Sequence, residues 1–303
     1  MTKRISVRLA ALVAAVSALV GGCGARQAEQ RPAVAGSPAA LSPQCTVPAV
    51  IGHRGTPADE NTLRGFEDAV AAGASGFELD VHWTRDNVPV LSHDPTVDRT
   101  TGGHGEIAAM TAAQVRGLRT DRGEPVPTLA EALKYAAAHR LTAMVELKPT
   151  PTPAQVRSLL TLVRAAGAGR YVIVHSFNRA AVDAVRHRAP ELRTGLTHDL
   201  TAISGAEAAR HGTELNVSRF LVTPQRVRQW HAAGLRVYAW TANWPPAWEK
   251  LRAAGVDVVL TDRVGPYREW ARKVCGPGAG SAPGALPVED VDREGAPRAR
   301  VEP

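Results

Sequence analysis

The chain has 303 residues with a formal net charge of +7, and 44% of its residues are hydrophobic. This length can bury a full core, either as one α/β barrel or as two smaller domains. The composition excludes a coiled coil and a wholly disordered chain. Because no block of Lys and Arg with interleaved aromatic residues occurs, we expect no nucleic-acid partner despite the positive charge.

The first 22 residues have the pattern of an export signal. Three basic residues are followed by an apolar run over 9–20, and two glycines directly precede Cys23. The run is shorter than the about 20 residues of a membrane-spanning helix. Residues 20–23 resemble the lipobox of bacterial lipoproteins. We therefore predict a lipoprotein signal peptide over 1–22, lipidation of Cys23 and a protein on the outer face of the cell membrane; an ordinary secreted protein is the alternative.

The segments that flank the central region lack apolar periodicity. Residues 23–46 are rich in Ala, Gln, Pro and Ser and predict a flexible tether, and residues 276–303 predict a disordered tail. We expect the folded domain over 47–275. Cys45 and Cys275 lie at its two edges, so an oxidising exterior would allow a disulfide between them; two free thiols are the alternative.

Within the central region, short β-branched apolar runs alternate with longer stretches of helical periodicity, which is the pattern of repeated βα units. Eight strands are expected, at Val47–Gly52, Gly76–Thr84, Leu141–Leu147, Tyr171–Ser176, Arg193–Thr197, Thr213–Val217, Leu235–Trp240 and Val256–Leu260. Seven helices are expected, over 62–72, 129–139, 153–166, 179–188, 204–211, 224–233 and 246–254. Eight repeats favour a closed (β/α)8 TIM barrel, which takes about 250 residues. Residues 85–127 are too long for a simple loop and predict an insertion after the second strand.

Charged residues occur at two of these expected strands. Glu78 and Asp80 are two apart, as are Glu146 and Lys148, so both members of each pair face the same side of a strand. Charges that face a barrel interior must be paired or bind a metal. Three carboxylates suit one Ca²⁺ or Mg²⁺ ion, and the absence of a cysteine or a close histidine cluster argues against zinc. A salt-bridged rim neutralised by Lys148 and nearby arginines is the alternative.

Two histidines stand where a barrel enzyme carries its reactive groups. His53 ends the first expected strand, and His93 lies in a Ser-His-Asp sequence of the insertion. Active-site groups gather at the ends of barrel strands. Two histidines beside a phosphate can exchange protons near neutral pH. Arg54 and Lys148 supply the donors that a phosphate needs.

Ten short blocks, in order and spacing over about residues 47–270, resemble the glycerophosphodiester phosphodiesterase family. They are His53-Arg54-Gly55, Glu60-Asn61-Thr62, Glu78-Leu79-Asp80-Val81, His93-Asp94, Arg99-Thr100-Thr101-Gly102, Pro127-Thr128-Leu129-x-Glu131, Glu146-Leu147-Lys148, Ser176-Phe177, Trp240-Thr241-x-Asn243 and Thr261-Asp262. The resemblance implies a barrel enzyme that hydrolyses glycerophosphodiesters. It implies an acid–base pair of His53 and His93, metal ligands Glu78, Asp80 and Glu146, and phosphate donors Arg54 and Lys148. Asp59 replaces a proline of the family pattern, which leaves the role of Glu60 open.

Three further residues have two interpretations each. Trp240 could pack against a glycerol group or belong to the core. His82 continues the face of Glu78 and Asp80 and could line the site or fill the barrel, and Asp262 is expected to fix a loop through hydrogen bonds. Two other functions stay open: the same chemistry on a teichoic acid polymer or a phospholipid, and a surface protein that binds without turnover.

Overall fold

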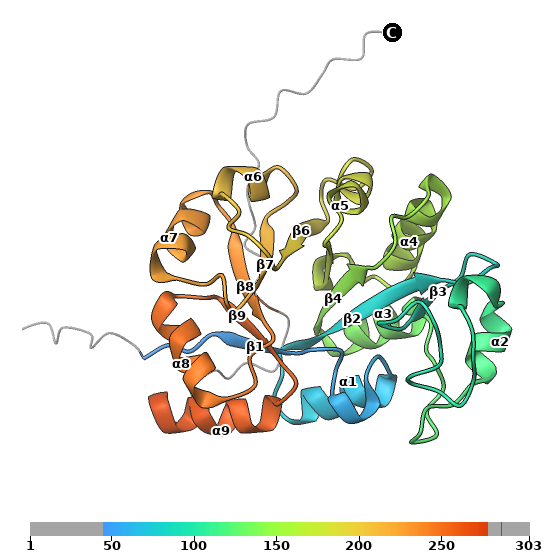
Figure 1. Cartoon of the computed structure of the whole chain (residues 1–303), viewed down its shortest axis with the longest axis horizontal. Helices are drawn as coiled ribbons and strands as arrows, with labels where there is room; N and C mark the ends of the chain where they lie inside the picture. Colours follow the sequence, from blue (N-terminus) through green and yellow to red (C-terminus); the bar gives the residue numbers. More distant parts are fainter. Residues whose placement is uncertain (1–44, 278–285, 287–303) are drawn as a thin grey trace, which may run out of the picture. The chain divides into compact units, whose positions relative to one another are not determined.

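The computed structural model describes residues 45–277 and residue 286, and these form a closed barrel with helices outside the strands (Figure 1). The barrel strands are β1 (Ala49–Gly52), β2 (Gly76–Trp83), β4 (Thr142–Leu147), β5 (Val172–Ser176), β6 (Arg193–His198), β7 (Glu214–Ser218), β8 (Arg236–Trp240) and β9 (Val258–Thr261). All neighbouring barrel strands pair in parallel, and β1 pairs with both β9 and β2, which closes the ring. The predicted eight-stranded TIM barrel is therefore confirmed.

The helices are η1 (Pro57–Asp59), α1 (Leu63–Ala71), η2 (Ile107–Ala109), α2 (Ala112–Gly117), α3 (Leu129–His139), α4 (Pro153–Ala165), η3 (Gly169–Tyr171), α5 (Arg179–Arg186), α6 (Gly205–Ala209), α7 (Pro224–Ala232), α8 (Pro245–Ala254) and α9 (Val264–Cys275). Seven agree with the expected helices, whereas α2 and α9 were not predicted. The first turn of α9 contains Gly265 and Pro266, which resemble loop residues in sequence. Proline fits there because the first helical N–H groups have no partner within the helix.

The segment between β2 and α3 forms a small unit of its own. Its strand β3 (Pro89–Leu91) runs antiparallel to the end of β2, with Val81 opposite Leu91. Beyond β3, η2 and α2 pack over five buried apolar residues: Val90, Val97, Ile107, Val115 and Val126. This packing fixes the segment after β3, which carries His93 at the carboxyl end of the barrel.

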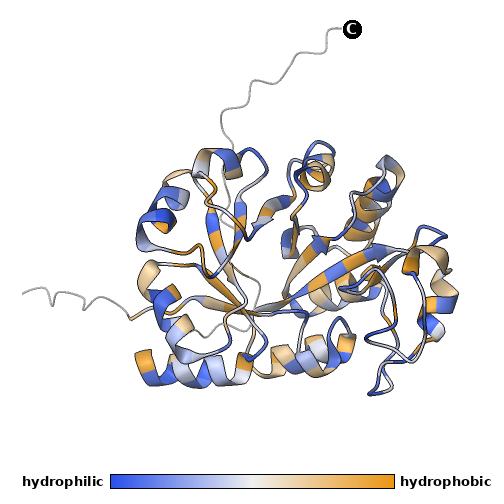
Figure 2. Cartoon of the chain, viewed as in Figure 1, coloured by the Kyte–Doolittle hydropathy of each residue, from blue (hydrophilic) through white to orange (hydrophobic). Residues whose placement is uncertain are grey.

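Alternation along the strands separates two apolar regions. Leu79 and Val81 of β2 point outward and pack against the helices, and hydrophobic and hydrophilic stretches alternate along β2 in Figure 2. Inside the barrel, a smaller buried group contains Ile51, Met144, Ile173, Tyr238, Val258 and Leu260. Leu286 joins this inner group, and its backbone N–H donates to Thr142 Oγ1 at 2.9 Å, at the amino end of β4.

A disulfide joins Cys45, just before the first strand, to Cys275 at the end of α9, with the two Cα atoms 5.3 Å apart across 230 residues of sequence. No helix in the described part of the chain combines the length and the apolar character that crossing a membrane requires. The predicted signal peptide and Cys23 lie outside the described residues.

Candidate active site

Parallel pairing brings the acidic residues of separate strands to one level of the barrel. Asp80 of β2 is opposite Glu146 of β4, and Glu146 is in turn opposite His175 of β5. Glu78 lies two residues before Asp80, on the same face of β2. All four side chains are buried, with exposed fractions between 1% and 6%. The structure therefore places the three predicted carboxylates inside the barrel, close to a histidine that was not predicted.

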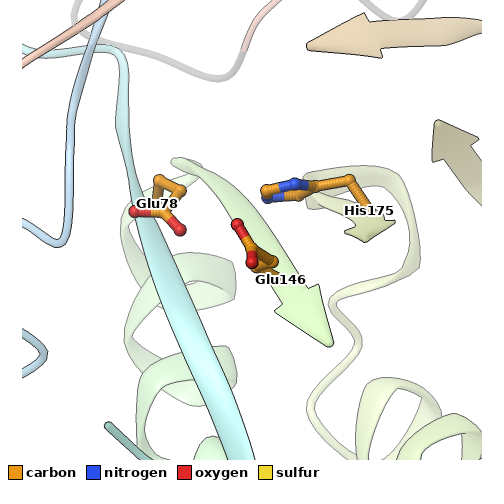
Figure 3. Close-up of side chains that lie close together, drawn as sticks. All are labelled: Glu78, Glu146 and His175. Atoms are coloured by element: carbon orange, nitrogen blue, oxygen red, sulfur yellow. The ribbon is translucent and has the colours of Figure 1, made fainter. Parts of the chain in front are cut away.

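Three of these side chains point toward one another: Glu78, Glu146 and His175 (Figure 3). One ligand atom from each lies within 4.8 Å of the other two. Metal–ligand bonds are about 2.0–2.6 Å long, so a separation of this size suits a cation between the three. Burial and the neighbouring carboxylates raise the pKa of Glu78 well above its usual value, and burial raises that of Glu146. At both glutamates, burial and the like charge of neighbouring carboxylates outweigh the attraction of Lys148.

Asp80 is held differently, by hydrogen bonds and an ion pair. Its Oδ1 accepts from Lys148 Nζ at 2.9 Å, and its Oδ2 accepts from Asn61 Nδ2 at 2.8 Å. Lys148 also donates to Glu146 Oε1 at 2.7 Å. Burial alone would raise the pKa of Asp80, but Lys148, Asn61 and Arg54 outweigh it and lower the pKa. Asp80 is thus an ionised carboxylate that already has partners.

His53 lies directly after β1, and a carboxylate from the other end of the domain fixes its ring. Its Nδ1 is 2.8 Å from Asp262 Oδ1, which places this carboxylate at the edge of the site. Asp262 also accepts from Asn243 Nδ2 at 2.6 Å, so its position is itself fixed. With Nδ1 occupied by Asp262, the imidazole offers Nε2 for proton exchange.

A longer chain of contacts holds His93. Its Nδ1 is 2.7 Å from Asp94 Oδ1, and Asp94 Oδ2 accepts from Arg99 Nε at 2.5 Å. Arg99 then donates to both oxygens of Glu60, at 2.7 and 2.8 Å. Glu60 also accepts from Arg54 Nη1 at 3.4 Å, so it contacts both arginines. Burial lowers the pKa of His93, and the hydrogen bond to Asp94 partly opposes this.

Arg54 and Trp240, the other two residues predicted to bind substrate, lie at the carboxyl end of the strands. Arg54 adopts a left-handed backbone with φ of 52°, and its N–H donates to Glu78 Oε2 at 2.9 Å. Its guanidinium lies 3.5 Å from Asp80. Trp240, at the end of β8, packs edge-on against Phe177 with ring centroids 5.6 Å apart. The indole Nε1 is buried without a hydrogen-bond partner among the described residues.

His175 is the site residue that sequence reasoning missed. It lies two residues after Ile173 on an expected strand, so strand periodicity alone places both on one face. The barrel assignment makes that face the interior. The prediction named only carboxylates as metal ligands, and the apolar run around His175 gave no sign of a polar residue that points inward.

A closed parallel barrel whose ionisable groups gather at the carboxyl ends of its strands defines the class: a TIM-barrel enzyme. The chain belongs to the glycerophosphoryl diester phosphodiesterase family, whose sequence profile matches residues 53–266. It is an enzyme of the phosphodiesterase class, as predicted.

Individual relatives agree with this assignment. The chain is 30% identical over 226 residues to a glycerophosphodiester phosphodiesterase of Caldanaerobacter subterraneus subsp. tengcongensis, which covers 70% of this chain and 93% of the relative. The glycerophosphodiester phosphodiesterase structure from Agrobacterium tumefaciens has a TM-score of 0.65 at 27% identity, covering 73% and 98% of the two chains. An Oleispira antarctica phosphodiesterase, solved with its product sn-glycerol-3-phosphate, has a TM-score of 0.64 at 27% identity, covering 73% and 94%.

Proposed function

We propose that this enzyme hydrolyses glycerophosphodiesters to glycerol phosphate and an alcohol, with the help of one divalent cation. The observation that carries the proposal is the buried group of Glu78, Glu146 and His175, whose ligand atoms are close enough together to hold a cation. Two histidines, His53 and His93, each have a carboxylate at Nδ1. The relative that was solved with sn-glycerol-3-phosphate supports the same product.

The cation would be held by Glu78 and Glu146, with Asp80 completing the predicted set of ligands. Carboxylate oxygens suit Ca²⁺ or Mg²⁺. The two buried glutamates suit a cation because Lys148 alone does not supply enough positive charge to keep both of them ionised. A bound cation would stabilise the charge that develops on the phosphate oxygens.

His53 and His93 would exchange protons with the substrate. Each has its Nδ1 on a carboxylate, so each can present Nε2 to the phosphodiester. One would take a proton from the attacking oxygen, either of water or of the neighbouring glycerol hydroxyl. The other would protonate the departing alcohol.

Donors around the cluster would bind the rest of the substrate. The Lys148 ammonium contacts Asp80 and Glu146, and its third N–H would donate to a phosphate oxygen. Arg54 offers a planar guanidinium. The unpaired indole N–H of Trp240 would donate to a glycerol hydroxyl, and its ring would cover the glycerol carbons.

The test is hydrolysis of glycerophosphocholine by metal-stripped protein, with and without added divalent cations. We expect activity to need the cation and to vanish in a His53→Ala/His93→Ala double variant. The matched control is His104→Ala, because His104 lies in the same insertion as His93 and its side chain is 86% exposed. Activity that survives chelation or the double substitution would refute the proposal. A wild-type protein that binds the cation but does not hydrolyse the substrate would favour the binding-protein alternative.

A second candidate substrate is a phospholipid, and one specific observation favours it. Five large hydrophobic side chains are exposed among the described residues, and four follow consecutive strands at the carboxyl end: Phe177, Leu200, Phe220 and Trp244. The guanidinium of Arg219 stacks on the rings of Phe220 and Trp244, at 3.9 and 4.6 Å from their centroids. Apolar side chains with a cation suit the boundary between acyl chains and phosphates.

If a phospholipid is the substrate, the enzyme should hydrolyse lysophosphatidylcholine faster than glycerophosphocholine. This preference should be smaller in a Leu200→Ser/Phe220→Ser variant. Val274→Ser is the control, because Val274 is the fifth exposed hydrophobic residue and lies on α9. Equal rates on both substrates would exclude the lipid preference. Faster release from a glycerol-phosphate polymer would identify the teichoic acid alternative.

Export with a lipid anchor at Cys23 is the proposed setting. The support is the sequence pattern of residues 1–23 together with the Cys45–Cys275 disulfide, since disulfides persist mainly in oxidising compartments. Growth of a bacterial producer with labelled fatty acid would test it. We expect label on the wild type and none on Cys23→Ser; unlabelled wild type would exclude the anchor.

A further inference from the structure

His175 has one ring nitrogen in use and one that lacks a partner. Its Nδ1 is 2.7 Å from Thr197 Oγ1, on the neighbouring strand β6. Its Nε2 is buried without a hydrogen bond to any described residue. Buried polar atoms without a partner are rare in proteins, because such an atom loses water and gains nothing in exchange. The side chain is only 1% exposed, so bulk water does not resolve the deficit.

The unpartnered nitrogen belongs to the group that faces the two glutamates. The imidazole points toward the carboxylates of Glu78 and Glu146 (Figure 3), within the 4.8 Å separation of the group. Histidines that bind metals usually engage their other ring nitrogen with a neighbouring polar group, which fixes the ring. The contact of His175 with Thr197 is an arrangement of this kind.

We infer that His175 is a ligand, through Nε2, of the cation held by Glu78 and Glu146, and that the site selects a first-row transition ion such as Mn²⁺ or Co²⁺ over Ca²⁺ and Mg²⁺. Calcium and magnesium take oxygen ligands, whereas imidazole nitrogen suits transition ions. Three protein ligands leave further positions for substrate oxygens. The inference rests on the proposed cation at the glutamates and changes the expected identity of that cation.

The strand pairing agrees with this role. Glu146 and His175 are paired on β4 and β5, which makes them neighbours inside the barrel, and Lys148 contacts both Glu146 and Asp80 through its ammonium group.

The decisive measurement is pulsed electron paramagnetic resonance of the full-length protein, stripped of metal and reloaded with Mn²⁺. We expect modulation from a coupled imidazole nitrogen, retained in His82→Gln and lost in His175→Leu. His82 is the matched control because it is a partly buried histidine two residues after Asp80, and its Nε2 contacts His93 O at 3.3 Å. A His53→Gln/His93→Gln variant should also keep the signal, which excludes the other two histidines of the site.

Affinity provides a second readout that does not depend on turnover. Calorimetric titration should give at least tenfold tighter binding of Mn²⁺ than of Ca²⁺ to the wild type, and His175→Leu should remove this preference. If His175→Leu fails to fold, the wild type and the His53→Gln/His93→Gln variant still decide through the nitrogen signal.

Bound Mn²⁺ without nitrogen coupling, or coupling that persists in His175→Leu, would overturn the inference and leave the proposed hydrolysis intact. Equal affinity of the wild type for Mn²⁺ and Ca²⁺ would also overturn it. A protein that binds no divalent ion would overturn both the inference and the metal dependence of the proposed function.

Discussion

Asp262 Oδ1 lies 2.8 Å from His53 Nδ1, although the two residues are 209 positions apart in the chain. His53 follows the first barrel strand and Asp262 follows the last, and these strands pair with each other. Closing the barrel therefore assembles the proposed acid–base group. A histidine whose Nδ1 is held by a carboxylate is fixed in both tautomer and orientation.

We expect Asp262→Asn to reduce kcat by about 10²-fold while KM and cation affinity change little, because the amide no longer fixes the tautomer and orientation of the His53 ring. Asp262→Glu should recover part of the loss because it restores the carboxylate. Steady-state kinetics on glycerophosphocholine would check this. An unchanged kcat in Asp262→Asn would show that the contact does not serve the reaction.

Arg99 should matter for turnover although it lies outside the cluster. It connects Glu60 to Asp94 and thereby positions His93, so Arg99→Gln is expected to lower kcat by about 10-fold to 100-fold, a range seen when supporting hydrogen bonds are removed. Arg85→Gln is the control, because Arg85 is exposed in the same segment. Equal kinetics in the two variants would contradict a positioning role.

Lys148 supplies positive charge to buried Asp80 and Glu146, at 2.9 and 2.7 Å. We expect Lys148→Met to destabilise the metal-free protein at pH 7 by about 3 kcal/mol, because it leaves buried carboxylates without their partner. Saturating divalent cation should shrink this loss, since the ion replaces the missing charge. Urea unfolding would measure both effects, with exposed Lys134→Met as control. A loss no larger than that of Lys134→Met would argue against the ion-pair network.

Glu131 links the insertion to helix α3 and predicts a pH-dependent stability. Burial would raise its pKa, but the ion pair with Arg116 and hydrogen bonds from Thr128 lower it to about 2 from 4.5. A lowered folded-state pKa stabilises above pH 4.5, and the contribution is lost as pH falls toward 2. Because the side chain is 35% exposed, we expect only about 1 kcal/mol.

Glu131→Gln isolates that charge, since glutamine can keep the helix cap with Thr128. The wild type should exceed the variant in urea midpoint at pH 6, and the difference should shrink between pH 4.5 and pH 3. A difference that stays constant over this range would contradict an electrostatic origin.

Sequence reasoning found the barrel because short apolar runs of strand length alternate with longer stretches of helical periodicity, and strand spacing showed which charged residues face inward. The same spacing placed Glu78, Asp80 and Glu146 on the inward face, where the structure buries them. It underestimated Asp262 and missed the link from Glu60 through Arg99 to Asp94, because these contacts join distant segments and follow no period. His175 was missed because a single polar residue within an apolar strand carries no motif, and only the pairing of β5 with β4 sets it beside Glu146.

The Cys45–Cys275 bridge has a mechanical consequence. Tension applied to the chain ahead of Cys45 would pass through the sulfur atoms into α9, so β1 would not bear the load alone. Strand β1, which directly precedes His53, would thus be protected from separating from β2 and β9. A pulling force on the residues before Cys45 would therefore leave His53 in its position beside Asp262.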